Sequence, residues 1–394
     1  MDDIKKKSLE LHRKFKGKVA IISKIPLKTK EDLSMAYTPG VAEVCNEIHK
    51  DVKKVYEYTF KGNSVVVVTD GSAVLGLGNI GPEAALPVME GKAILFKELA
   101  NIDAFPICLA TQDDDEIVNI VKNIAPVFGG INLEDISAPR CFHIEEKLQD
   151  IGIPVMHDDQ HGTAITVLAA LINAAKVVGK DPTELKVVIN GSGAAGIATS
   201  HLLSCYKTDK KICTPVSDII MCDSKGIIYE GREDLNDFKK EIALYTNKEN
   251  RKGSVKDALR GADVFIGLSK GNLLTASDLK VMNKDAIIFA MANPTPEIMP
   301  DEAKKVATIV GTGRSDFPNQ INNSLAFPGV FRGALDAKAV KINKEMKIAA
   351  AHAIAGCIIP TRDAILPYTL DKTVALKVAE AVKKAAIQTK VCRE

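Results

Sequence analysis

Short apolar runs alternate with longer amphipathic stretches through the first 160 residues, a pattern typical of strands alternating with helices. The β-branched run at 64–69 lies between two turn-forming pairs, Gly62-Asn63 and Asp70-Gly71, which favours a buried strand. Other apolar runs predict strands at 104–110, 129–132 and 152–157, although a proline at position 106 weakens the first. The pattern also predicts a helix that begins near Asp115.

The second half of the chain shows the same alternation. A buried helix is expected at 163–178 and a final helix at 371–390. Strands are expected at 186–190, 217–223, 263–267 and 286–291, with a helix between the first two that reaches Leu203. We therefore expect an α/β fold in two parts, an N-terminal α/β domain at 1–160 and a doubly wound, Rossmann-type domain with a C-terminal helix at 161–394. A chain of 394 residues exceeds the size at which one core keeps growing, which agrees with two domains.

Composition and charge exclude several classes of protein. Hydrophobic residues make up 46% of the chain and charged residues 26%, as in ordinary globular proteins. Lys and Arg total 52 against 50 for Asp and Glu, so there is no basic footprint for nucleic acid or an anionic membrane. No apolar run approaches the ~20 residues of a membrane span, and the acidic N-terminus does not resemble a targeting signal. We expect a cytoplasmic protein without nucleic-acid or membrane partners.

The eight cysteines occur singly, and no CxxC pair supports zinc binding or thioredoxin-type chemistry. Their flanking residues are mostly apolar. Unpaired thiols of this kind suit a reducing compartment, so we expect them to be free.

A glycine loop follows the strand predicted at 186–190. In GxGxxG loops the first glycine permits the tight turn, the second lets the backbone approach a pyrophosphate, and the third allows close packing of the following helix. Asp223 ends the next predicted strand, where a carboxylate can accept hydrogen bonds from the adenosine ribose. The sequence therefore predicts an NAD or NADP site that includes Gly191, Ser192, Gly193, Ala194, Ala195, Gly196 and Asp223.

Two acidic clusters each follow a predicted strand. Glu134, Asp135 and Asp159 offer carboxylate oxygens, which suit Mg²⁺ or Mn²⁺ better than zinc or copper. Both clusters fall at carboxyl ends of strands, the edge at which open α/β sheets bind ligands. Asp158, next to Asp159, is placed to orient a base. The acids at 113–116 instead open a predicted helix, where they favour its positive end rather than a metal.

A metal site beside a dinucleotide site points to redox chemistry on a hydroxy acid that chelates the metal next to the nicotinamide. Lys92 lies in an apolar helical stretch, where a lysine either extends to solvent or, if buried near a cation, serves as a base. Tyr37 precedes a turn and either packs or offers its hydroxyl to a ligand. Asn293, Asn322 and Asn323 are either turn residues or contacts for a substrate carboxylate.

Together these segments resemble the malic enzymes. The similarity covers most of the chain and is closest to the short microbial form, without the phosphotransacetylase-like extension of some members. The matching motifs are YTPGVA at 37–42, DGSAVLGLGNIG at 70–81, EGKAILFKELA at 90–100, GGINLEDI at 129–136, HDDQHGTA at 157–164, NGSGAAG at 190–196, ANPTPEI at 292–298 and GRSDFPNQINNSLAFPGVFRGA at 313–334.

The resemblance implies oxidative decarboxylation of (S)-malate to pyruvate and CO₂ with reduction of NAD(P), dependent on Mg²⁺ or Mn²⁺, and also decarboxylation of oxaloacetate. It implies that Lys92 takes the proton of the malate C2 hydroxyl and that Tyr37 protonates the enolpyruvate. The three carboxylates match the metal ligands, and the three asparagines match substrate contacts, with Asn293 also at the cofactor.

Three further expectations concern partners and specificity. The resemblance implies a homodimer, and Tyr37 is far in sequence from the other site residues, so we expect it to complete the site of the partner subunit. Asp223 would repel a 2′-phosphate, so we expect NAD to be preferred over NADP, with Lys225 softening that preference. Ala73 stands where larger malic enzymes have an arginine, so another group must hold the substrate carboxylate, such as the backbone amides of 76–78.

Other functions remain open at this point. A malolactic enzyme, which converts malate to lactate, would use the same residues. A silent nucleotide-binding protein would be expected to lack Lys92, Tyr37 or the acids, and all of them are present. An amino-acid dehydrogenase of similar build would not need three carboxylates of the metal-binding type.

Overall fold

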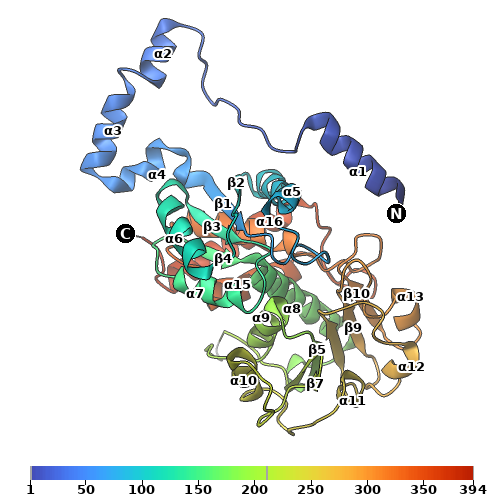
Figure 1. The fold of residues 1–394 in the computed structure, drawn as a ribbon. Coiled ribbons are helices and arrows are strands. Elements are labelled where there is room, and N and C mark those ends of the chain that lie inside the picture. The colour runs from blue at the N-terminus through green and yellow to red at the C-terminus, as the bar shows by residue number, and fades with distance from the viewer. Residues whose placement is uncertain (1, 210–211, 394) are drawn as a thin grey trace.

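The computed structural model describes residues 2–209 and 212–393. Two sheets follow one another along the chain, preceded by a helical arm and followed by three helices that pack back on the body (Figure 1). This arrangement confirms the predicted α/β class.

The N-terminal arm comprises α1 (Asp2–Phe15), α2 (Lys30–Ala36), α3 (Val41–Lys50) and α4 (Val55–Tyr58). Figure 1 shows α1, α2 and α3 in dark and mid blue, standing away from both sheets. Neither α2 nor α3 buries a residue. The segment between α1 and α2 carries apolar side chains that are open to solvent, with Ile21 89% and Ile22 81% exposed. The arm therefore presents an apolar surface that its own chain does not cover.

The first sheet has the strand order β2-β1-β3-β4, and all its strands are parallel. In β1 the valines alternate between two cores, so this strand is covered on both faces. Pro106 is tolerated because β2 is an edge strand. The elements are β1 (Ser64–Thr69), α5 (Pro82–Ala100), β2 (Asp103–Cys108), α6 (Asp114–Ile124), β3 (Gly130–Leu133), α7 (Arg140–Lys147) and β4 (Val155–His157).

The second sheet has the order β10-β9-β8-β5-β6-β7, parallel except for β7. Numbered within this sheet, the order is 3-2-1-4-5-6, that of dinucleotide-binding domains, and the order reverses at β5. The strand β10 was not predicted, because its apolar run is short and ends in Gly-Thr. The elements are β5 (Lys186–Asn190), α9 (Ala194–Leu203), β6 (Asp218–Asp223), β7 (Gly226–Ile227), α10 (Asp237–Ala243), α11 (Val255–Ala258), β8 (Val264–Gly267), α12 (Ala276–Leu279), β9 (Ile287–Ala290), α13 (Pro300–Ala303) and β10 (Ile309–Thr312).

The helix α8 (Asp158–Val178) joins the two sheets, and it begins five residues before the predicted start because its two acids form the first turn. Among the described residues it is the one helix long and apolar enough to cross a membrane, but 61% of its apolar window is buried inside the protein. It packs against α9 and against α15 (Lys344–Ala355), as a core helix does.

The C-terminal helices return to the first sheet. Both α14 (Phe327–Asp336) and α16 (Lys372–Gln388) pack against α5. Phe327 and Phe331 meet Phe96 of α5 at ring-centroid distances of 4.7 and 5.5 Å. The end of the chain therefore contributes to the core behind the first sheet. The boundary near residue 160 stays a prediction.

One expectation about the cysteines was wrong. Cys205 and Cys213 form a disulfide, whereas we expected unpaired thiols. The chain turns back after α9, where the Val216 amide donates to the Leu203 carbonyl at 2.9 Å, and this return brings the two Cα atoms to 5.8 Å. Because their separation of eight residues matches no common motif, only the fold pairs them. The other six cysteines are free.

Candidate active site

The two acidic clusters meet at one edge of the first sheet. Leu133 at the end of β3 pairs in register with His157 at the end of β4, so the residues that follow each strand emerge together. Oxygen atoms of Glu134, Asp135 and Asp159 lie within 4.8 Å of one another. Asp135 has a φ of 52°, and this left-handed conformation turns consecutive side chains toward the same side, which a regular strand would not do.

The three carboxylates are crowded and incompletely bonded. The Asp135 amide donates to Asp159 Oδ2 at 2.7 Å, and Asn132 Nδ2 donates to Glu134 Oε2 at 2.8 Å. Asp135 Oδ2 is buried and has no hydrogen-bond partner among the described residues. Burial, and then repulsion by neighbouring carboxylates, raises the pKa of Asp135 to about 9. A buried oxygen without a partner among like charges is what a divalent cation relieves, so the residues fit Mg²⁺ or Mn²⁺.

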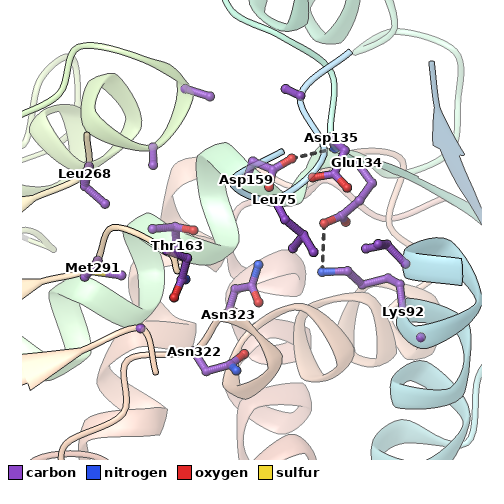
Figure 2. Close-up of a pocket in the computed structure, with 18 of the residues that line it drawn as sticks. Leu75, Lys92, Glu134, Asp135, Asp159, Thr163, Leu268, Met291, Asn322 and Asn323 are labelled. Atoms are coloured by element: carbon purple, nitrogen blue, oxygen red, sulfur yellow. Dashed lines mark hydrogen bonds and ion pairs between the residues drawn. The ribbon is translucent and has the colours of Figure 1, made fainter. Parts of the chain in front are cut away.

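Lys92 projects from α5 into this cluster (Figure 2). Its Nζ lies 3.0 Å from Glu134 Oε1 and 2.7 Å from Asp158 Oδ2, and the side chain is 8% exposed. The ammonium group also lies 4.2 Å from the centre of the Phe327 ring. Lys92 therefore does not extend to solvent. Burial acts to lower its pKa, but the charges of Asp158 and Glu134 outweigh burial and hold the pKa above its ordinary value.

Asp158 is fully buried and links Lys92 to the second half of the chain. Its Oδ2 accepts hydrogen bonds from Lys92 Nζ and from Asn323 Nδ2, both at 2.7 Å. Gly162 lies one turn further along α8, and a Cβ there would come within 1.8 Å of Asp158 Oδ1. The glycine in the second motif thus leaves room for the Asp158 carboxylate.

A cavity of about 1040 Å³ connects these groups with the second domain. Figure 2 shows Lys92 and Glu134 on one side, Leu268 and Met291 on the opposite side, and Asn322 and Asn323 below. The cavity is also lined by Leu75, Thr163, Leu268 and Met291, which were not predicted as site residues. Leu75 and Thr163 lie within the matching motifs at 70–81 and 157–164, whereas no motif marked a role for Leu268 or Met291. The predicted site residues that line the cavity are Lys92, Glu134, Asp135, Asp159, Gly193, Ala194, Ala195, Asn293, Asn322 and Asn323.

The glycine loop has the expected strand before it and helix after it. Gly191 has a φ of 126°, and a Cβ on Gly196 would come within 1.8 Å of the Gly191 carbonyl oxygen, so the turn and the helix pack without space for side chains. Nothing lies within 4 Å of the Cβ position of Gly193, which lines the large cavity and an adjoining cleft of about 690 Å³. That cleft extends past Ser192 to Asp223.

Asp223 ends β6 as expected, but its carboxylate is already engaged. Arg232 Nη2 donates to both oxygens at 2.9 Å, Lys239 Nζ donates at 2.7 Å, and the Lys225 amide donates at 2.9 Å. The acid is therefore not a free negative charge facing the ribose.

Two other expectations concern Tyr37 and the loop at 71–78. Tyr37 is 68% exposed at the end of α2 and does not line the cavity, so one chain by itself does not bring it to Lys92, and its expected place in the partner's site stays a prediction. The backbone amides of 76–78 were expected to hold the substrate carboxylate in place of the missing arginine. The Leu77 amide instead donates to the Val74 carbonyl at 3.0 Å, so this amide is not available to a carboxylate. The acids at 113–116 act as expected, with Asp113 capping α6.

Comparisons with known proteins agree with this geometry. Residues 16–149 match the malic enzyme N-terminal domain and residues 160–387 match the malic enzyme NAD-binding domain. The chain belongs to the malic enzyme family. It is 57% identical to the bifunctional malic/malolactic enzyme of Bacillus subtilis (strain 168), across 99% of this chain and 95% of that protein.

Two further relatives support the family and the fold. The NAD-dependent malic enzyme of Geobacillus stearothermophilus is 54% identical over 96% of this chain and 78% of its own length. The crystal structure of the NAD-dependent malic enzyme of Thermotoga maritima is 49% identical and superimposes with a TM-score of 0.91, covering 95% of this chain and 98% of that one. Other relatives are NADP-dependent malic enzymes, so the family includes both cofactors.

Proposed function

We propose that this protein oxidatively decarboxylates (S)-malate to pyruvate and CO₂ with reduction of NAD or NADP, and that it uses Mg²⁺ or Mn²⁺. The observation that carries the proposal is the contact between a buried lysine and a metal-type acid cluster, with Lys92 Nζ 3.0 Å from Glu134, in a cavity that reaches the glycine loop. Decarboxylation of oxaloacetate is expected as a partial activity, because oxaloacetate is the product of the first step.

The chemistry can be assigned to this chain's own residues. A cation held by Glu134, Asp135 and Asp159 would supply Lewis acidity and offset the charge around Lys92, and a bound nicotinamide would supply the acceptor for the hydride of C2. Lys92 accepts the proton of the C2 hydroxyl, and oxidation then gives oxaloacetate. Breaking the C3–C4 bond releases CO₂ and leaves enolpyruvate. Lys92 returns its proton to the C2 oxygen as this bond breaks. Tyr37 then donates a proton to C3 of enolpyruvate while Lys92 takes the enol proton, and the product is pyruvate.

The remaining residues hold these groups in place. Asp158 receives the ammonium of Lys92 and the amide of Asn323, so it couples the base to the loop that also carries Asn322. Asn293 and Asn322 line the same cavity and offer amide groups to the substrate carboxylates. Asn293 lines the same cavity as Gly193 of the glycine loop, which suits its second proposed role at the cofactor.

The proposal requires a homodimer with shared sites. Tyr37 is exposed on an arm with uncovered apolar residues, whereas Lys92 is buried in the body. A second copy of the chain would cover the apolar arm and would receive Tyr37 at its cavity. Homodimers commonly bury exposed apolar segments of this kind by exchanging the same segment between their two subunits.

A malolactic activity is the second candidate, supported by the Bacillus subtilis relative, whose name includes it. The two activities share the oxidation and decarboxylation steps and differ in whether pyruvate leaves or is reduced to lactate. The same cavity therefore suits both.

An assay of malate turnover with and without Mn²⁺ tests the proposal, with NADH or NADPH, pyruvate and lactate all measured. We expect pyruvate and reduced cofactor in equal amounts, only when the metal is present. Lactate without net reduced cofactor would support malolactic activity instead. Turnover of neither kind would contradict the proposed function.

A further inference from the structure

The adenosine end of the cofactor cleft has a charge arrangement that the sequence did not reveal. A carboxylate offers about four lone-pair positions. Asp223 uses four, two for Arg232 Nη2, one for Lys239 Nζ and one for the Lys225 amide. A ribose hydroxyl therefore finds no open acceptor position on Asp223 while Lys239 stays in place.

The cations around Asp223 differ in what they can still bind. Arg232 is saturated, since its Nε and Nη2 also donate to Asp234 and its Nη1 donates to the carbonyls of Gly226 and Ile227. Its side chain is 8% exposed and bonded to the backbone of β7, so it acts as a fixed part of the structure around Asp223. Lys239 has three ammonium hydrogens and, within the described part of the chain, one acceptor for them, and its side chain is 22% exposed.

Lys239 lines the cleft together with two other lysines. These are Lys225 and Lys270, which line the cleft as the glycine loop and Asp223 do. Lys225 Nζ pairs with Asp234 at 2.8 Å and Lys239 Nζ pairs with Asp223 at 2.7 Å, whereas Lys270 pairs with no carboxylate among the described residues. Arg232, which pairs with both of these acids, adds a further positive charge. The cleft is therefore cationic where the 2′ position of the adenosine ribose would lie.

We propose that this end of the cleft accepts a 2′-phosphate, with Lys239 as its main contact and Asp223 as the counter-ion that positions Lys239. The inference rests on the proposed NAD(P)-binding function and deepens it. It replaces the expected preference for NAD, because the repulsion on which that preference was based is cancelled by Arg232 and Lys239. NADP is then the better cofactor, and Lys239 determines the specificity.

A binding experiment without malate or metal tests this directly. Adenosine 2′,5′-bisphosphate and adenosine 5′-monophosphate differ only in the 2′-phosphate, and their affinities can be measured by calorimetry. For the wild-type protein we expect the bisphosphate to bind about tenfold or more tightly, the effect of one charge-assisted hydrogen bond or more. Lys239→Gln should remove most of this difference and leave the monophosphate affinity nearly unchanged.

The neighbouring lysine provides a matched control. Lys240 lies on the same helix but pairs with Asp237 at 3.2 Å, is 61% exposed and does not line the cleft, so Lys240→Gln should keep the wild-type ratio. Equal affinities of the two nucleotides for the wild type, or an unchanged ratio in Lys239→Gln, would overturn the inference. A preserved ratio in a protein that does not turn over malate would leave the inference standing while the proposed function fails.

Discussion

Lys92 and Asp158 form an ion pair in the interior of the molecule, with 2.7 Å between Nζ and Oδ2 and side chains 8% and 0% exposed. One partner comes from the helix behind the first sheet and the other from the helix that joins the two sheets. The pair therefore fixes the proposed base relative to the cofactor side of the cavity.

Lys92→Ala should reduce kcat for malate oxidation by about 10²–10⁴, the usual contribution of a general base. Lys97→Ala is the control, because Lys97 lies on the same helix but its side chain is 50% exposed. Steady-state kinetics and nucleotide binding should be measured together, since only turnover should fall. Near-normal turnover of Lys92→Ala would show that the lysine is structural.

Asp159→Ala should abolish metal-dependent turnover, because it removes one of three oxygen ligands that lie within 4.8 Å. Mn²⁺ binding, followed by electron paramagnetic resonance, should weaken by at least about tenfold. Asp115→Ala is the control, since this acid belongs to the first turn of α6 and pairs with Lys147. Full wild-type activity in excess chelator would contradict the metal assignment.

Gly162→Ala should lower both turnover and Tm, because the new Cβ would lie 1.8 Å from Asp158 Oδ1 in a buried site. Helix propensity by itself predicts the opposite, a gain of about 1 kcal/mol. Gly91→Ala, where a Cβ meets only Lys18 Nζ at 3.5 Å, should keep or raise Tm. A Gly162→Ala protein that melts at a higher temperature than the wild type would refute the steric argument.

Mixing two inactive variants should restore activity if Tyr37 acts in the partner's site. Tyr37→Phe and Lys92→Ala subunits would form hybrid dimers in which one of the two sites is intact. At equal amounts and full exchange, about a quarter of all sites should be active. Exchange should be verified by mass spectrometry of the mixed dimer, and exchanged but inactive protein would disprove the shared site.

The free energy of unfolding should decrease as the pH is lowered from about 6.5 to about 4. Burial, together with Lys344, lowers the pKa of His201 to about 4, whereas the unfolded chain binds the proton near pH 6.5. The unfolded state therefore holds more protons in this window, and stability rises with pH across it. His201→Phe, which can keep the stacking on Tyr206, should flatten the slope by on the order of 1–3 kcal/mol in urea titrations. His157, whose pKa burial also lowers to about 4, should account for part of the slope that remains. An unchanged slope would show that His201 takes no part.

The sequence by itself determined the local structure and the chemical types at the site. Strands at 64–69 and 186–190 were predicted with the bounds that the structure has, because β-branched runs between turn residues specify a buried strand through local patterning. The glycine loop and the start of the helix after it were likewise predicted from the sequence. The tight turn and the close packing of this loop depend on neighbours within seven residues.

Only the tertiary structure decided which distant groups meet. Lys92 reaches Asp158 across 66 residues, Asn323 reaches the same carboxylate across 165, and neither contact has a local sequence pattern. Asp223 was correctly placed at the end of a strand, but its carboxylate was expected to be unpaired. Its partners Arg232 and Lys239 come from a turn and a helix, and no sequence pattern indicates that they lie next to Asp223. Tyr37 shows the same principle, since its motif is local but its surroundings depend on how the exposed arm is covered. Side-chain type follows from sequence, whereas the electrostatic environment is a sum over groups that folding alone brings within a few ångströms.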